Sequence, residues 1–243
     1  MNQAKQFSTE LAAVIPAAGV GKRMQAGIPK QYLKINQQSI LEHTINKLSA
    51  ITAIKQIILV VSDSDPFIAT LKPNLPPHVQ IVEGGNERVN SVLAGLKSID
   101  RERFSWCLVH DAARPCVLVE DIENLIKQCL STNQGGILAT PVRDTMKRQK
   151  FFANGGQTVI DSTENREGLW HALTPQMFPV QSLVEAIEAG LTNQLEITDE
   201  ASAIEPTGAH IHLVEADASN IKITRASDLA LAEFFLNREH NED

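Results

Sequence analysis

The chain has 243 residues, of which 43% are hydrophobic and 21% charged, proportions typical of a soluble globular protein. With 22 Lys and Arg against 29 Asp and Glu, its formal net charge is −7, which excludes the basic face of a general nucleic-acid binder. A small anionic ligand stays compatible with that charge, because a few local cations can hold it. The cysteines Cys107, Cys116 and Cys129 lack metal or redox spacing, so we expect reduced thiols in a cytoplasmic protein. No run approaches about 18 apolar residues, so we expect no membrane span.

Short apolar runs without alternation, rich in Val, Ile and Leu, are typical of strands buried on both faces. They lie at 11–15, 57–61, 78–82, 106–109 and 136–139. Apolar residues at helical spacing predict helices between them, over 40–51, 89–99 and 122–129. Strands alternating with helices predict an α/β, Rossmann-like fold, with a largely parallel sheet and helices on both faces. Ligands of such sheets bind beyond the carboxyl ends of the strands.

The pattern breaks after Val142 in a polar, β-leaning stretch with Asn154-Gly155-Gly156 at its middle. Segments 146–152 and 158–162 predict a hairpin around that turn. An isolated hairpin is marginally stable, so we interpret 142–168 as a protruding arm that packs on something else, such as a second subunit. The α/β pattern then resumes at 169–178, with a helix near 180–189, a strand at 210–214 and a last helix over 225–237. We take 1–243 as a single domain with this arm.

The first predicted strand leads into a loop of small residues that suits an anion. Backbone amides can approach a ligand closely there, and two cations follow. The loop residues are Pro16, Ala17, Ala18, Gly19 and Gly21, and the cations are Arg23 and Lys30. The sequence is neither a P-loop nor a dinucleotide fingerprint. A plain tight turn with solvated cations would look the same, so the loop alone leaves both interpretations open.

Three further segments carry polar residues at loops of the predicted fold. In Glu83–Ser91, Asn86 is expected to cap the following helix. Asp111 follows the fourth strand, where it can bind substrate hydroxyls or reach a magnesium ion, and Arg114 can simply pair with it. His110 is expected to be structural. Thr198 is expected to cap a helix that starts with acidic residues.

Two segments near the end of the chain complete the candidates. Residues 220–224 are expected to form a short strand that carries Lys222. His210 and His212 share one face of a strand, but with no third ligand nearby a solvated face is favoured over a metal site.

Ile15–Met24 followed by Pro29-Lys30-Gln31-Tyr32 resembles the signature of nucleotidyltransferases that join a nucleotide to a phosphorylated sugar or polyol. The strings His-Asp-Ala-Ala-Arg-Pro at 110–115 and Trp-His-Ala-Leu-Thr-Pro-Gln at 170–176 narrow the resemblance. From about Leu11 to Leu236 the chain resembles the 2-C-methyl-D-erythritol 4-phosphate cytidylyltransferase family of the non-mevalonate isoprenoid pathway. The resemblance implies transfer of CMP from CTP to that substrate, giving 4-diphosphocytidyl-2-C-methyl-D-erythritol and pyrophosphate. It also implies Mg²⁺ held mainly by the CTP phosphates and a homodimer formed through the arm.

The resemblance carries roles onto individual residues of this sequence. The implied catalytic residues are Arg23, Lys30, Arg166 and Lys222. The implied CTP-binding residues are Pro16, Ala17, Ala18, Gly19, Gly21, Arg23, Lys30, Gly85, Asn86, Ser91, Ala112 and Lys222. The implied substrate-binding residues are Asp111, Arg114, Thr145, Arg166, Thr174, Thr198 and Lys222, with Asp111 also the candidate metal ligand. The arm is implied to deliver Arg166 into the partner subunit's site. The family often has Asp where this chain has Asn86, Asn90 and Asn165.

The predicted chemistry needs no protein nucleophile. A phosphate monoester is already ionised at neutral pH, so its oxygen can attack the α-phosphorus of CTP in line and expel pyrophosphate. Two alternatives stay open at this stage. One is cytidylyl transfer to another polyol phosphate, such as ribitol 5-phosphate. The other is a non-catalytic nucleotide-sensing module, since a fold does not fix a function.

Overall fold

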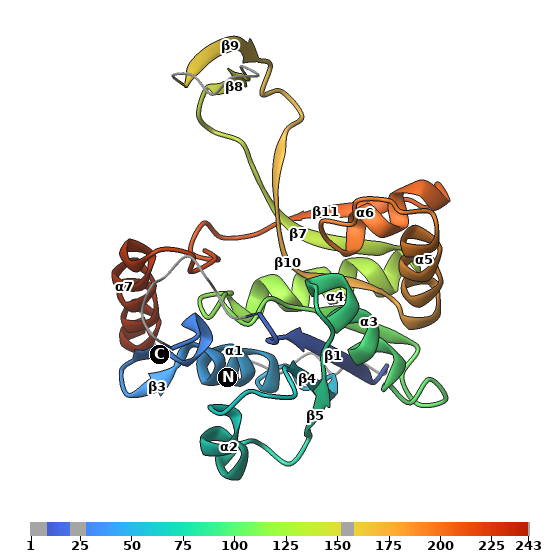
Figure 1. The fold of residues 1–243 in the computed structure, drawn as a ribbon, viewed down its shortest axis with the longest axis vertical. Coiled ribbons are helices and arrows are strands. Elements are labelled where there is room, and N and C mark those ends of the chain that lie inside the picture. The colour runs from blue at the N-terminus through green and yellow to red at the C-terminus, as the bar shows by residue number, and fades with distance from the viewer. Residues whose placement is uncertain (1–8, 20–27, 152–157, 243) are drawn as a thin grey trace.

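The unalternating apolar runs form the strands of a seven-stranded sheet in the computed structural model, which describes residues 9–19, 28–151 and 158–242 (Figure 1). The strands are β1 (Leu11–Pro16), β4 (Ile54–Val61), β5 (Val79–Glu83), β6 (Trp106–Val109), β7 (Gly135–Pro141), β10 (Trp170–Pro179) and β11 (Ile211–Glu215). Their order is β11-β7-β10-β6-β1-β4-β5. Only β10 among these strands runs antiparallel to its neighbours, so the sheet is largely parallel, as predicted.

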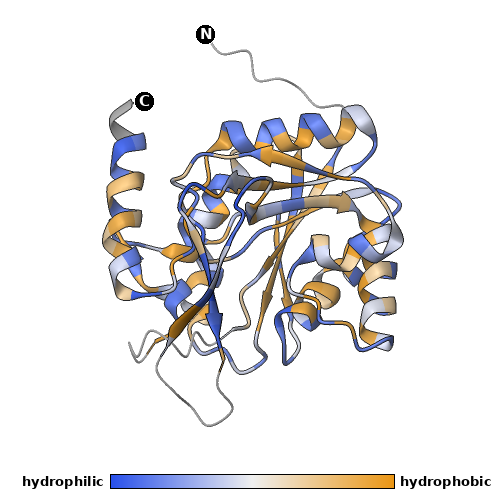
Figure 2. Cartoon of the chain, turned by 90° about the horizontal axis from the view of Figure 1, so that it is seen from above, coloured by the Kyte–Doolittle hydropathy of each residue, from blue (hydrophilic) through white to orange (hydrophobic). Residues whose placement is uncertain are grey.

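Helices cover both faces of the sheet, as the continuous apolar runs require. The side chains of Leu11, Ala13 and Ile15 pack toward α1 (Ile40–Ser49) and α4 (Val119–Thr132). Those of Ala12 and Val14 pack on the other face, where α3 (Arg88–Lys97), α5 (Val180–Thr192) and α6 (Glu200–Ile204) lie. Seen from above, the hydrophobic strands lie between helices whose turns alternate in hydropathy (Figure 2).

The α3 helix packs very closely on the sheet at Gly95. A Cβ atom added there would lie 2.6 Å from Val14 Cγ1 and 2.8 Å from Val60 Cγ2, distances that real Cβ contacts do not reach. The absence of a side chain at Gly95 therefore sets how closely α3 can approach β1 and β4.

Every helix and sheet strand predicted from apolar spacing is present, with shifts of a few residues at the ends. The last helix, α7 (Ala226–Glu242), begins close to where it was expected and packs on a separate apolar cluster that includes Ile40, Ala232 and Leu236. Short elements escaped prediction. They are η1 (Lys30–Tyr32), β2 (Lys34–Ile35), β3 (Gln38–Ser39), α2 (Ile68–Leu71), η2 (Lys72–Asn74) and η3 (Glu205–Thr207). No helix in the described ranges is both long and apolar enough to cross a membrane.

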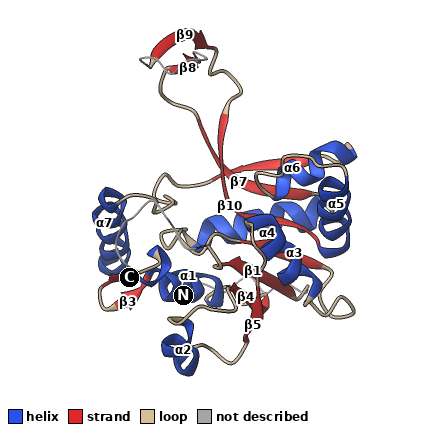
Figure 3. Ribbon diagram, in the orientation of Figure 1, coloured by secondary structure: helices blue, strands red, loops and turns tan. Residues whose placement is uncertain are grey.

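The polar stretch after β7 is an arm built on a two-stranded hairpin, β8 (Met146–Lys150) and β9 (Val159–Glu164), as predicted (Figure 3). It stands well away from the sheet and its helices. Phe151 is 85% exposed and Ile160 64% exposed. Large apolar side chains in water are what an arm ordered by a partner would present.

The prediction of a short strand at residues 220–224 is wrong, because the segment is an irregular loop. Two backbone carbonyls of this loop accept hydrogen bonds from side chains and not from a neighbouring strand. Arg114 Nη1 donates to Asn220 O at 2.8 Å and Lys30 Nζ donates to Ile223 O at 2.9 Å. Ile223 N donates to Ala113 O at 2.9 Å. Within this loop, Ile223 packs in the α7 cluster and Lys222 lines the cleft.

Replacing a central core residue will destabilise the protein far more than replacing an edge residue of the same type. Leu108→Ala, in a strand where Leu108 is 0% exposed, should lower the free energy of unfolding by about 2–5 kcal/mol, because it leaves a cavity. Leu213→Ala is the control: Leu213 is 49% exposed on the edge strand β11, so the cost should be about 1 kcal/mol or less. Urea unfolding followed by circular dichroism measures both. Equal losses for the two variants would contradict the assigned layers.

Candidate active site

The carboxyl ends of β1, β5 and β6 open onto one cleft, the place where sheets of this topology bind ligands. It encloses about 670 Å³ of empty space including its open mouth, a size suited to a small molecule. The lining residues are Pro16, Ala17, Ala18, Gly19, Lys30, Gln31, Gly85, Asn86, Glu87, Arg88, Ser91, Asp111, Ala112, Ala113 and Lys222. Every described residue expected to bind CTP is among them. Gly21 and Arg23 lie outside the described residues.

A buried amide fixes the small-residue loop after β1. Gln31 is 3% exposed, and its Nε2 donates to Ala17 O at 2.8 Å and to Gly19 O at 3.2 Å. Because those two carbonyls are taken by Gln31, the loop backbone is held in one shape beside the cleft. The Lys30 ammonium, one residue earlier, donates to Ile223 O on the loop that leads to α7. The lysine is thus tied to a segment almost two hundred residues away.

The turn after β5 is folded around the hydroxyl of Ser91. Gly85 N donates to Ser91 Oγ at 3.2 Å, and that hydroxyl lies 3.3 Å from Gly85 O and 3.2 Å from Glu87 O. A Cβ at Gly84 would lie 2.7 Å from Ser91 Oγ and 2.9 Å from Ala18 Cβ, so glycine is required there by close approach. The predicted N-cap Asn86 is wrong by one residue: α3 is preceded by Glu87, which makes no side-chain cap bond. The Ser91 hydroxyl, which lies one helical turn into α3, makes the hydrogen bonds that hold residues 85–87, and no side chain caps the helix.

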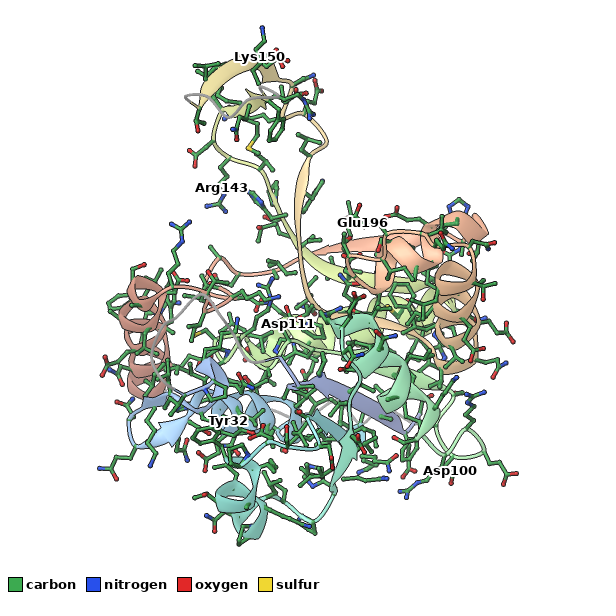
Figure 4. All side chains as sticks on the ribbon, in the orientation of Figure 1. Tyr32, Asp100, Asp111, Arg143, Lys150 and Glu196 are labelled. Atoms are coloured by element: carbon green, nitrogen blue, oxygen red, sulfur yellow. The ribbon has the colours of Figure 1, made fainter. Side chains whose placement is uncertain are left out.

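The centre of the site is the carboxylate of Asp111, labelled in the middle of Figure 4. Three cations surround it. Arg88 Nε lies 3.2 Å from Oδ1, while Arg114 Nε and Lys222 Nζ lie 3.3 and 2.9 Å from Oδ2. Burial acts to raise the pKa of Asp111, but Arg88, Lys222 and Arg114 outweigh it and hold that pKa well below its usual range. Asp111 is therefore ionised at any working pH. Arg114 does pair with Asp111, the alternative that the sequence left open, and both side chains are buried.

His110, next in the chain, is a structural residue, as expected. Its Nε2 lies 3.1 Å from Arg114 O, a group that only accepts, so Nε2 carries the proton. Nδ1 then accepts the Thr174 hydroxyl at 2.9 Å, and Thr174 Oγ1 accepts Asp111 N–H at 3.0 Å. Burial lowers the pKa of His110 to about 4. The neutral, fully buried ring holds the strand end that carries Asp111.

A second hollow adjoins the first and shares Arg88, Asp111 and Lys222 with it. It is lined by Arg88, Asp111, Arg114, Ala172, Leu173, Thr174, Gln176, Thr198, Asp199 and Lys222. The structure therefore brings five expected substrate-binding residues together here: Asp111, Arg114, Thr174, Thr198 and Lys222. The predicted N-cap Thr198 is wrong, because Asp199 caps α6 by accepting from Ser202 N. Thr198 is exposed at the hollow, and its hydroxyl lies 3.4 Å from Ser202 Oγ of α6.

Two expected substrate-binding residues lie on the arm and not in either hollow. Thr145 and Arg166 are both exposed, and Arg166 Nη1 donates to Arg143 O within the arm. In Figure 4 Arg143 lies near the base of the arm and Lys150 at its tip, both apart from Asp111. Within one chain these arm residues do not reach the cleft.

Asp111 could provide one ligand to a metal ion, with the remaining ligands coming from substrate and water. Both of its oxygens already face cations. Among the described residues there is no group of three or more His, Cys, Asp or Glu that could hold a metal ion. Mg²⁺ commonly binds through one or two carboxylates together with substrate phosphates and water. The side chains here suit that arrangement and not an all-protein metal site.

Several residues of the site were missed in the sequence. Among them are the buried Gln31 and Glu200 and the partly exposed Arg88. Gln31 stands inside a string that carries the family resemblance, and Arg88 stands between Asn86 and Ser91, to which the resemblance gives a role, so their position was a signal. Glu200 was interpreted only as a favourable charge in the first turn of a helix, and nothing local to it indicates its partner.

The comparisons with known proteins agree with this geometry. The family model for 2-C-methyl-D-erythritol 4-phosphate cytidylyltransferase matches residues 11–238. The chain belongs to this family. A protein of that name from Colwellia psychrerythraea is 55% identical over 233 residues, which cover 94% of this chain and 95% of the relative. Its counterpart from Vibrio vulnificus (strain CMCP6) is 52% identical over 233 residues, 95% of this chain and 96% of the relative.

A solved structure extends the match to the fold. A crystal structure of 4-diphosphocytidyl-2C-methyl-D-erythritol synthase superposes with a TM-score of 0.80 and 35% identity, over 95% of this chain and 100% of that chain. As a member of the 2-C-methyl-D-erythritol 4-phosphate cytidylyltransferase family, the chain is an enzyme, and the alternative of a non-catalytic sensing module is set aside. The expected α/β fold is confirmed.

The buried neutral His110 should make the protein lose stability in mild acid. Its pKa of about 4 lies below the ordinary value of 6.5, so below pH 6.5 the unfolded chain takes up a proton that the folded chain refuses. Stability should fall by up to about 3 kcal/mol between pH 6.5 and 4 from this residue. In His110→Gln, which keeps a donor for Arg114 O but does not titrate, that part of the loss should vanish. Urea unfolding at several pH values measures the difference, and parallel curves for the two proteins would contradict it.

Proposed function

We propose that the two hollows carry out the reaction of the family. CMP passes from CTP to 2-C-methyl-D-erythritol 4-phosphate, giving 4-diphosphocytidyl-2-C-methyl-D-erythritol and pyrophosphate, with CTP entering as its magnesium complex. The observation that supports this most is the cluster of Arg88, Arg114 and Lys222 on Asp111, with Lys30 across the first hollow. A concentration of cations inside a chain of net charge −7 suits phosphate ligands.

The lining residues give each substrate a place. CTP fits the first hollow, where Ser91 and the backbone of Gly85 and Asn86 lie at the base, and Ala18 and Gly19 offer backbone amides to the phosphates. The phosphate of the acceptor fits the second hollow, near Arg114, Thr174 and Thr198. Lys222 lines both hollows, so it lies where the acceptor phosphate would meet the α-phosphorus.

The chemistry in this arrangement is positioning and charge neutralisation. A bond forms between an oxygen of the acceptor phosphate and the α-phosphorus, while the bond from that phosphorus to pyrophosphate breaks. The attacking phosphate is already an anion, so no protein base is required. Lys30 and Lys222, and Arg23 by family resemblance, stabilise charge that builds on the α-phosphoryl group. The magnesium that accompanies CTP neutralises further charge on the triphosphate.

The arm supports a homodimer in this proposal. Its hairpin buries little apolar surface of its own, and Phe151 and Ile160 are exposed. Arg166 and Thr145 do not reach the hollows of their own chain, so we assign them to the acceptor site of the partner subunit. A guanidinium suits that task, because its planar fork can bind a phosphate through two hydrogen bonds.

The reaction can be tested by pyrophosphate release with CTP and magnesium. We expect release with 2-C-methyl-D-erythritol 4-phosphate and not with ribitol 5-phosphate. Lys30→Ala should lower turnover at least tenfold, because removal of a charge contact to the transition state costs about 3 kcal/mol, or about 100-fold. Lys34→Ala, an exposed lysine four residues later, is the control and should keep wild-type turnover. Release with ribitol 5-phosphate alone would keep the mechanism and overturn the substrate, and wild-type turnover of Lys30→Ala would remove that residue from catalysis.

A site shared between subunits predicts complementation between two inactive variants. Lys222→Ala damages the site of its own chain, and Arg166→Ala damages the site of the partner. In a mixed dimer of the two variants, one site keeps Lys222 from one chain and Arg166 from the other. Random mixing should therefore restore about a quarter of the wild-type rate, since half of the dimers are mixed and each has one intact site of two. Co-expression with two tags and a pyrophosphate assay measures this, and no recovery in isolated mixed dimers would place Arg166 in its own chain's site.

A further inference from the structure

Arg88 joins two carboxylates that come from distant parts of the chain. Its Nη1 and Nη2 lie 2.7 and 3.3 Å from the two oxygens of Glu200, and its Nε lies 3.2 Å from Asp111 Oδ1. The fork on Glu200 is bidentate, which fixes the plane of the guanidinium. The side chain therefore holds the start of α3, the start of α6 and the end of β6 in one arrangement.

The position of Arg88 also links the two hollows. It is the first residue of α3, directly after the turn 84–87 that borders the proposed nucleotide hollow. Glu200 is the first residue of α6, two residues after Thr198 in the proposed acceptor hollow. Arg88 itself lines both hollows.

The turn before α6 is also held by the side chain of Gln176 on β10. Gln176 is 1% exposed, and its Nε2 donates to Asp199 Oδ2 at 2.9 Å while Ala201 N donates to its Oε1 at 2.9 Å. These bonds fix the backbone on the β10 side. The ion pair with Arg88 is what ties the turn to the nucleotide side.

The burial of Glu200 makes its ion pair with Arg88 a poor contributor to folding stability. It is 2% exposed, and burial raises its pKa even though Arg88 favours the charged form. Replacing a buried ion pair by apolar residues is often neutral or stabilising, so such a pair is weak evidence for a role in stability alone. A role in holding the turn 84–87 and the loop 198–200 in a fixed relative position accounts both for the burial of the Glu200 charge and for its location between the hollows.

We propose that Arg88 and Glu200 are positioning residues. They fix the acceptor loop 198–200 and the carboxylate of Asp111 against the turn 84–87, which we call the nucleotide loop. The acceptor site is then complete only when the nucleotide loop is in place. This inference rests on the proposed function for the identity of the two ligands. Neither residue is assigned contact with a reacting atom.

Glu200→Gln separates this role from a general effect on folding, because it keeps the size of the side chain and removes its charge. We expect the KM for 2-C-methyl-D-erythritol 4-phosphate to rise at least tenfold, while the Kd for CTP, measured without acceptor, changes less than threefold. Lys97→Ala is the matched control, since it breaks the exposed pair of Lys97 on α3 with Glu188 on α5, 2.6 Å apart. It should change neither constant. Equal weakening of both substrates by Glu200→Gln, or an unchanged acceptor KM, would overturn the proposal.

Arg88→Lys provides a second variant if Glu200→Gln does not fold. Lysine keeps the charge but cannot bind Glu200 through a fork and reach Asp111 at once. The KM for 2-C-methyl-D-erythritol 4-phosphate should again rise at least tenfold, and the Kd for CTP should rise by a smaller factor. An acceptor KM within twofold of wild type would show that the bridging geometry of Arg88 is dispensable.

Hydrogen exchange gives a readout that does not require turnover. In the wild-type protein CTP should slow exchange in residues 84–91 and also in 198–204, and in Glu200→Gln it should protect only the first segment. Protection of both segments in the variant, or of the first alone in the wild type, would overturn the coupling. If the wild-type protein binds CTP but releases no pyrophosphate with 2-C-methyl-D-erythritol 4-phosphate, the proposed substrate fails, and the exchange comparison still decides whether the pair links the loops.

Discussion

The arrangement of this site depends on one buried carboxylate. Asp111 is 7% exposed, and removing its charge from water is costly unless partners compensate. Arg88, Arg114 and Lys222 provide that compensation, and they come from α3, from the loop after β6 and from the loop before α7. The carboxylate therefore acts as a common anchor for segments that are far apart in the chain. Arg88 and Lys222 line both hollows and Arg114 lines the second, so the three cations also face the space that an anionic ligand would occupy.

The sheet explains why this anchor lies where it does. The continuous apolar run of β6 places its end at the carboxyl edge, and the sequence was enough to predict that edge. β10 runs antiparallel beside β6 with Gln176 opposite Val109, so the start of β10 lies at the same edge. That register brings Thr174 to Asp111 N, which strand periodicity along either segment could not reveal. Strands and helices with strong apolar spacing were thus predictable, whereas the pairing of β10 was not.

The mistakes in prediction share one physical cause. Residues 220–224 and the caps at Asn86 and Thr198 were interpreted from local preferences for a strand or a capping side chain. In the structure their backbone groups bind elsewhere: Ile223 O accepts Lys30, and the Gly85 turn is held by Ser91. Such partners lie many residues away or one helical turn on, so local propensity cannot identify them. Glu200 shows the same limit, since its charge suits a helix start in sequence and pairs with the distant Arg88 guanidinium in space.

The polar groups of the described site favour a reaction in which the substrate supplies the nucleophile. His110 is neutral, fully buried and bonded on both ring nitrogens, so it cannot serve as a base for a ligand in the cleft. The Ser91 hydroxyl is held within its own turn, and all three cysteines are buried, which raises the pKa of each thiol. Beside the carboxylates of Glu87, Asp111 and Asp199, the hollows present cations, backbone amides and hydroxyls. Such groups lower the energy of a phosphoryl transition state by fixing geometry and charge, and an ionised phosphate monoester needs only those two contributions to attack.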